Sequence, residues 1–113
     1  MKESNILKQI TLYVSERGYI PLRLNSGKFY QGTLRNTPEY GEILTKLRHI
    51  AGTVEGTADL LVILDCGRVL WVETKTRTGR QREAQKRFQA EVERLGHNYV
   101  LAREIKDLEE YIK

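Results

Sequence analysis

The sequence predicts an α/β fold in which helices flank a mixed β-sheet. Two apolar runs of strand length, residues 60–64 and 69–72, are separated only by a short turn. Residues 3–17 and 78–95 instead repeat their apolar positions every three or four residues, as amphipathic helices do. Residues 98–102 form a further strand, which is expected to lie parallel to its neighbour because a helix connects the two. This order of elements predicts an α/β sandwich.

The first helix, residues 3–17, ends at Gly18, which is suited to a helix C-cap. Glu3 lies on the apolar stripe of this helix, so its carboxylate is expected to point toward the sheet. The alternative is a first-turn glutamate that only complements the helix dipole. Residues 19–25 alternate as a strand does, and Pro21 favours the start of that strand or an edge position.

Residues 26–55 show the least regular pattern and are interpreted as a variable insertion. Residues 29–32 predict a short strand. Residues 42–50 fit either a short helix or an extended segment, because their apolar residues also match helical spacing. A dimer contact and a substrate-shaping loop both remain open as roles, and Lys46 and Arg48 are candidates for phosphate contacts.

The turn between the two apolar runs sets which residues face each other. A two-residue loop at 66–67 would place Asp59 opposite Thr74, whereas a three-residue loop at 65–67 would place Asp59 opposite Glu73. The second is favoured, because a type I turn followed by a left-handed residue suits an early aspartate and a glycine in third place. It would also keep the intervening cysteine out of the positive φ of a type I′ turn.

Asp59, Glu73 and Lys75 are then expected on one face at the ends of two strands. Two carboxylates this close repel each other, and Lys75 neutralises only part of their charge. A divalent cation does so better, and oxygen ligands suit Mg²⁺ or Mn²⁺. The alternative is a surface Glu–Lys pair with Asp59 as a turn residue.

The composition excludes several classes of protein. The 113 residues suffice for one domain, residues 1–113, with a modest core. No apolar run reaches about 18 residues and none follows the first five residues, so we expect neither a transmembrane helix nor a signal peptide. Cys66 is the single cysteine, which excludes an internal disulfide and a cysteine-based zinc site. His49 and His97 lack metal-ligand spacing. An intracellular protein is therefore expected.

Basic residues gather just after the acids. The formal net charge is only +4, but the segment from Lys75 to Arg87 contains six basic residues against one acid. Such a cluster beside candidate metal ligands indicates phosphate contacts, although a solvated helix face is the alternative. Its members are Lys75, Arg77, Arg80, Arg82, Lys86 and Arg87.

The helix after the hairpin is expected to open at Thr78, with Gln81 completing a capping box. Its N-terminus favours a bound phosphate. Gln85 borders the buried stripe near the acids, and Gly96 provides the C-cap. The inward stripe is Gln81, Ala84, Phe88, Val92 and Leu95, and residues 105–112 predict a last amphipathic helix.

Asp59 followed by Glu73-x-Lys75 resembles the PD-(D/E)xK nuclease signature, with Ala58 where that family often has proline. The stretch from residue 56 to 88 more narrowly resembles the VRR-NUC (virus-type replication-repair nuclease) branch, and residues 23–27 resemble its arginine-asparagine-x-x-glycine strand end. The matching residues are Gly56, Asp59, Glu73, Lys75, Thr76, Gly79 and Gln85. The resemblance implies a restriction-endonuclease-like αβββαβ core with a mixed central sheet flanked by helices.

The resemblance also implies an activity, that of a Mg²⁺- or Mn²⁺-dependent, structure-selective DNA endonuclease. Asp59, Glu73 and the backbone carbonyl of Thr74 would be metal ligands, with Glu3 reaching the metal directly or through water. Lys75 would orient the attacking water, and Gln85 would hold a water or a phosphate. The residues expected to bind DNA are Arg23, Asn25, Lys28, Arg77, Arg80, Arg82, Lys86 and Arg87.

The expected substrate is branched DNA, including four-way (Holliday) junctions, and the expected assembly is a homodimer encoded by a bacterium or phage. A non-catalytic nucleic-acid-binding module on the same fold is the main alternative. It would explain the basic helix but not the convergence of two acids and a lysine, and it would need no Mg²⁺. A small interaction protein is the third class, and it predicts no salt-dependent affinity for DNA.

Overall fold

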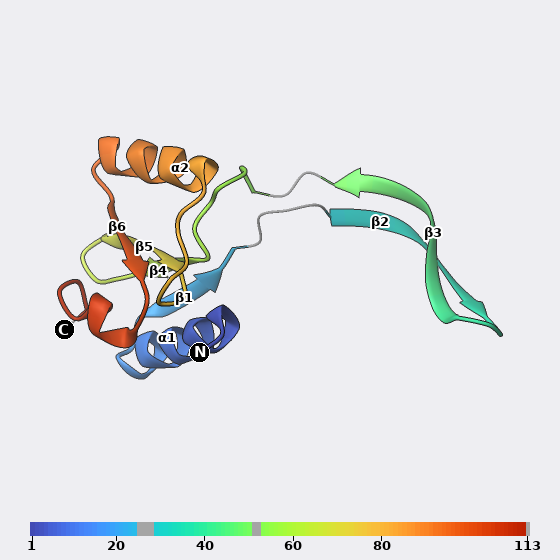
Figure 1. Cartoon of the computed structure of the whole chain (residues 1–113), viewed down its shortest axis with the longest axis horizontal. Coiled ribbons are helices and arrows are strands. Elements are labelled where there is room, and N and C mark those ends of the chain that lie inside the picture. The colour runs from blue at the N-terminus through green and yellow to red at the C-terminus, as the bar shows by residue number, and fades with distance from the viewer. Residues whose placement is uncertain (25–28, 51–52, 113) are drawn as a thin grey trace.

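A computed structural model describes residues 1–24, 29–50 and 53–112 (Figure 1). Within these residues no helix is long and apolar enough to cross a membrane. The elements are α1 (Glu3–Glu16), β1 (Ile20–Arg23), β2 (Phe29–Thr37), β3 (Gly41–Ile50), β4 (Leu60–Ile63), β5 (Val69–Thr74), α2 (Glu83–Arg94), β6 (Asn98–Ala102) and the 3₁₀ helix η1 (Ile105–Leu108).

Four strands form a mixed central sheet in the order β1-β4-β5-β6. β4 is antiparallel to β1 and β5, while β6 is parallel to β5, as expected for a strand reached through a helix. α1 and η1 pack on one face of the sheet and α2 on the other (Figure 1). The predicted α/β sandwich is confirmed, and Pro21 lies on an edge strand, where its missing N–H costs no ladder bond.

Each face of the sheet has its own core. The apolar stripe of α1, namely Ile6, Ile10 and Val14, packs against Leu60, Val62, Leu70 and Val72. On the other side Val92 of α2 meets Tyr99, with Trp71 and Phe88 packed around them. The alternation along β5 therefore sends residues 70, 72 and 74 toward α1 and residues 71, 73 and 75 toward α2.

The insertion contains a long β-hairpin, which we call the hairpin arm (residues 29–50). β2 and β3 are antiparallel, with Thr37 opposite Gly41 and a turn at 38–40. The extended interpretation of residues 42–50 is thus correct and the helical one is wrong. The arm projects away from the body (Figure 1), and the radius of gyration, 17.1 Å, exceeds the ~13 Å of a compact chain of this length.

The β4–β5 turn has the predicted strand register, but its backbone conformation differs from the predicted one. Leu60 pairs with Val72 and Ile63 with Val69, which carries Asp59 to the position opposite Glu73. However, Cys66 has φ +54° and the following glycine φ +72°, so the expectation that Cys66 avoids a positive φ is wrong. The turn has left-handed residues at both central positions, and Asp65 is the extra residue that restores the register.

The second helix begins later than predicted, at Glu83 rather than Thr78. Arg103 Nη1 donates to the carbonyl oxygens of Thr76 (2.5 Å) and Gly79 (2.7 Å). These bonds hold the residues before the helix in a loop with a turn at 77–78. Gln85, not Gln81, takes the third helical position and caps the helix.

Three smaller expectations can also be compared with the structure. Gly18 and Gly96 end their helices with φ values of +83° and +91°, as predicted. Leu95 is exposed rather than part of the inward stripe of α2. The expected helix at 105–112 is only the four-residue η1 followed by a turn, and Asp107 Oδ2 caps its start by accepting bonds from the backbone N–H groups of residues 103 and 104.

Candidate metal centre

Three carboxylates converge where the first turns of α1 and α2 lie beside one end of the sheet. One carboxylate oxygen from each of Glu3, Asp59 and Glu73 lies within 4.8 Å of the other two. Glu3 comes from the first turn of α1, Asp59 precedes β4, and Glu73 is near the end of β5. In Figure 1 the N-terminal ends of both helices lie on the side from which the hairpin arm leaves. The predicted convergence of Asp59 with Glu73 is confirmed, and Glu3 joins them.

Asp59 is fixed by its bonds to β5. Its Oδ2 accepts hydrogen bonds from the backbone N–H (2.8 Å) and the hydroxyl (2.7 Å) of Thr74. Both bonds go to Oδ2, so Oδ1 is the oxygen that β5 does not use. The Thr74 side chain was not among the predicted functional groups, since only its carbonyl was considered. Strand alternation gave no signal for this bond, because it turns Thr74 to the face opposite Glu73.

Glu73 is buried, with 2% of its surface exposed. Its Oε1 accepts a hydrogen bond from Gln85 Nε2 (3.0 Å) and lies 4.0 Å from Lys75 Nζ. Its Oε2 is buried and has no hydrogen-bond partner among the described residues. Burial first, and the charge of Asp59 second, raise the pKa of Glu73 to about 8, against the opposing effect of Lys75.

Gln85 connects the carboxylate to the start of α2. Its Nε2 donates to Glu73 while its Oε1 accepts from the backbone N–H of Arg82 (2.8 Å), so one amide caps the helix and orients the acid. Gly56 makes this arrangement possible. It has φ +87°, and a Cβ there would lie 2.2 Å from the Ala84 carbonyl oxygen. Only glycine lets the chain pass this close to the first turn of α2.

The donor set fits a hard divalent cation. A buried carboxylate oxygen without a partner is costly unless a proton or a cation meets it. In an octahedral Mg²⁺ site adjacent oxygens are about 3 Å apart and opposite oxygens about 4.2 Å, so three carboxylate oxygens within 4.8 Å of one another are near the spacing that one ion requires. Oxygen ligands of this kind suit Mg²⁺ or Mn²⁺ better than softer metals. Glu3, Asp59 and Glu73 are thus the residues able to hold such an ion.

Two further groups around the site were not predicted. Arg103 holds the loop after Lys75 in place through the backbone carbonyls of residues 76, 77 and 79. Tyr99 is buried beside the acids, its hydroxyl accepts a hydrogen bond from Gln81 (3.1 Å), and burial raises its pKa above the usual range. Arg103 lies more than twenty residues from the loop, so no local pattern indicates its role.

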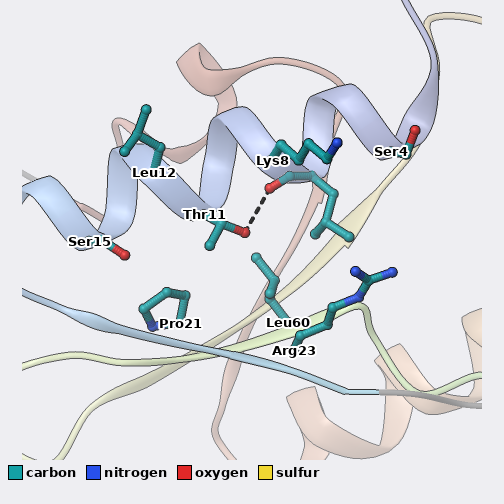
Figure 2. Close-up of a pocket in the computed structure, with 9 residues that line it drawn as sticks. Ser4, Lys8, Thr11, Leu12, Ser15, Pro21, Arg23 and Leu60 are labelled. Atoms are coloured by element: carbon teal, nitrogen blue, oxygen red, sulfur yellow. Dashed lines mark hydrogen bonds between the residues drawn. The ribbon is translucent and has the colours of Figure 1, made fainter.

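The predicted DNA-binding side chains fall into two groups. Arg77, Arg80, Arg82, Lys86 and Arg87 are exposed on the loop before α2 and on its first turns. Arg23 ends β1 opposite Leu60 and lines a cavity of about 400 Å³ between α1 and β1, with Lys8 on its rim (Figure 2). Asn25 and Lys28 lie outside the described residues.

No protein-family model matches the sequence, and a search of curated proteins found no relative. A solved structure described as "VRR_NUC domain" is similar to this chain with a TM-score of 0.65. The alignment covers 98% of this chain and 97% of that one, at 20% sequence identity. The chain has the VRR_NUC fold. The fold that the motif around Asp59, Glu73 and Lys75 implied is thereby confirmed, and the hairpin arm falls within the aligned length.

Proposed function

We propose that this protein is a metal-dependent endonuclease that hydrolyses phosphodiester bonds in DNA. The observation that carries the proposal is the cluster of Glu3, Asp59 and Glu73 on a VRR_NUC fold, with Lys75 beside it. The name of the structural neighbour suggests a nuclease of the PD-(D/E)xK type. The partnerless Oε2 of Glu73 supports a cation at this point.

Each side chain has a distinct task in this proposal. Asp59 and Glu73 hold the ion, with the carbonyl of Thr74 as an additional ligand and Glu3 bound directly or through water. When bound, a divalent cation lowers the pKa of the attacking water and offsets charge on the phosphate. Lys75 orients that water and balances the developing negative charge. Gln85 keeps Glu73 in one orientation through its bond to Oε1.

The basic residues suit the DNA backbone rather than its bases. Arg77 and Arg80 extend from the loop that follows Lys75, and Lys86 and Arg87 continue the surface on α2. Contacts of this kind position a duplex without reading sequence. We therefore infer selectivity for DNA structure, with branched DNA and four-way junctions as the preferred substrates. We also propose an intracellular site of action.

A homodimer is the assembly we propose for cutting a two-fold junction. Leu34 pairs with Leu44 on the hairpin arm, and a Cβ at Gly32 would lie 3.0 Å from Leu47 and 3.6 Å from Leu44. We call Leu34, Leu44 and Leu47 the apolar face of the arm; they are 62%, 50% and 56% exposed. An isolated two-stranded ribbon is only marginally stable in water, and the same face of a second copy covers it symmetrically.

The cleavage assay tests the activity directly. Purified protein is incubated with linear duplex, single strand, flap and four-way junction, with Mg²⁺, with Mn²⁺ and with EDTA. We expect metal-dependent cleavage that is fastest on branched DNA. Binding to all four without cleavage under any condition would instead support the non-catalytic module.

Sedimentation tests the dimer separately. We expect the mass of a dimer, and the mass of a monomer for Leu34→Ser/Leu44→Ser. A monomeric wild-type protein across the accessible concentrations would contradict the dimer and leave the nuclease proposal standing.

A further inference from the structure

The segments of chain that precede and follow the hairpin arm meet beside the candidate metal centre. β1 ends at Arg23 before the arm, and the chain returns to the sheet at Asp59. The backbone N–H of Leu24 donates to the carbonyl oxygen of Asp59 (2.9 Å), so the segments before and after the arm are bonded together at a candidate metal ligand. From this point the arm projects outward (Figure 1). A long molecule held at the carboxylates is therefore able to continue along the arm.

The face of the arm opposite the apolar face is polar and basic. Gln31 pairs with Arg48, and Thr33 pairs with Thr45. Residues that pair across a ladder share a face. Arg48 donates to Gln31 Oε1 (2.5 Å), and both line a shallow hollow with Thr33 and Lys46. We call this surface the basic face; its polar members are Gln31, Thr33, Arg35, Thr45, Lys46 and Arg48, and the half-buried Ile43, which pairs with Arg35, is an apolar side chain on the same face.

The charges on the basic face all have one sign. Arg35, Lys46 and Arg48 are exposed, and within the described residues none of them forms an ion pair with an acid. The two acids of the arm lie elsewhere: Glu39 is in the turn, and Glu42 belongs to the opposite face by alternation. Cations brought together on one ribbon repel each other, so this surface favours a polyanion.

The dimensions and side chains of the arm match a nucleic-acid duplex. The basic face runs along β2 from Gln31 to Arg35, which is about 16 Å at ~3.3 Å per residue. That is the length of about five base pairs at ~3.4 Å each. Arginine, lysine, threonine and glutamine are the side chains that commonly bind phosphate oxygens. A two-stranded ribbon also has the width that a major groove admits.

We propose that the basic face of the hairpin arm binds the phosphate backbone of duplex DNA extending from the cleavage site. The inference rests on the proposed function for the identity of the ligand. It adds a second contact region, about five base pairs long, that is separate from the carboxylates and from α2. The arm then selects substrates by the length of duplex beside the scissile phosphate.

The test measures DNA binding in EDTA, so that it does not depend on cleavage. Wild-type protein is compared with Arg35→Gln/Lys46→Gln/Arg48→Gln on labelled four-way junctions whose arms are about five or about fifteen base pairs long. Glu39→Gln/Glu42→Gln, on the same arm but off the basic face, is the matched control. Circular dichroism and sedimentation verify that each variant is folded and keeps its assembly state.

We expect the longer junction to bind wild type and control more tightly than the shorter one, and this gain to disappear in the triple variant. The logarithm of the binding constant falls linearly with the logarithm of the salt concentration. Loss of three phosphate contacts makes this slope less steep by about 2.7. Between about 50 and 200 mM salt, the wild type therefore weakens about 40-fold more than the variant.

An unchanged slope and an unchanged gain with duplex length would overturn the inference. The same holds if the triple variant loses only its self-association, because the basic face would then contact a second copy. If the triple variant does not fold, Lys46→Gly replaces it. Lys46 has φ +54°, which glycine adopts without strain, and its loss should lower the slope by about 0.9. Failure of cleavage with a positive binding result would count against the nuclease proposal alone.

Discussion

In the body of the protein the side chains around Glu73 are buried and bonded to one another, whereas the cations of the hairpin arm are exposed and bonded only within the ribbon. Gln85 is 4% exposed and Lys75 8%, and both contact Glu73. Arg35 and Lys46 are exposed on strands that pack mainly on each other. Tertiary contacts thus fix geometry where chemistry needs it, and a two-stranded ribbon suffices where only charge is needed.

The largest difference should appear in catalysis. Asp59→Asn, Glu73→Gln and Lys75→Met should each lower the cleavage rate at least about 1,000-fold, because each removes a group that acts on the transition state. Affinity for DNA in EDTA should not fall in these variants. Substitutions on the basic face should instead lower the affinity for DNA and not the rate at which bound DNA is cleaved. Unchanged cleavage in any of the three body variants would remove that residue from the catalytic assignment.

Glycine substitutions compare the packing of the two regions. Gly56→Ala should destabilise the protein by about 3 kcal/mol, because a left-handed residue is combined with a clash against Ala84. Gly41 also has a positive φ, but a Cβ there meets nothing within 4 Å. Gly41→Ala should therefore cost about 1 kcal/mol and leave the unfolding midpoint of the body unchanged. Chemical denaturation followed by Trp71 fluorescence reports on the body, so the midpoint should fall for Gly56→Ala and stay for Gly41→Ala; equal shifts would contradict the difference in packing.

The buried acid should make the metal-free body sensitive to pH. The pKa of Glu73 is about 8 in the folded protein against an ordinary 4.5, so the folded state holds this proton more tightly. Its stabilising contribution is complete below about pH 4.5 and is lost as the pH rises through about 8. In EDTA the free energy of unfolding should fall between about pH 5 and 8, and fall less in Glu73→Gln.

The matched control for this titration is Glu42→Gln, because Glu42 is exposed on the arm. It should keep the wild-type dependence on pH. Parallel curves for Glu73→Gln and wild type would show that the proton on Glu73 has no part in stability.

A smaller effect is expected at Glu3, which is the exposed member of the cluster. Glu3→Gln should lower the cleavage rate about tenfold, because its carboxylate supports the ion rather than holding it alone. The helix content measured by circular dichroism should not change. Turnover at the wild-type rate would return Glu3 to a purely structural role.

The sequence was sufficient where the deciding interactions are local. The alternation around Glu73 and Lys75 and the short turn at 65–67 predicted the strand register and the meeting of the carboxylates. Local patterns failed where a distant side chain decides. Arg103 is far in sequence from the loop it bonds, and Gln85, which caps α2 at Glu83, is itself bonded to the distant Glu73.

The arm was ambiguous for a different reason. Its apolar residues at 43, 44, 47 and 50 fit helical spacing, and a ribbon that packs on little else imposes no alternating burial to contradict it. The structure shows a ribbon, because β2 and β3 pair antiparallel from Phe29–Ile50 to Thr37–Gly41. The left-handed conformation of Cys66 was missed because the turn keeps its register with an extra residue at Asp65.

A crystal structure of the protein grown with Mn²⁺, with anomalous scattering recorded at the manganese edge, tests the central claim most directly. The account predicts a strong anomalous peak between the carboxylates of Asp59 and Glu73, within reach of Glu3. An absence of any peak there, at a Mn²⁺ concentration that supports cleavage, would contradict it.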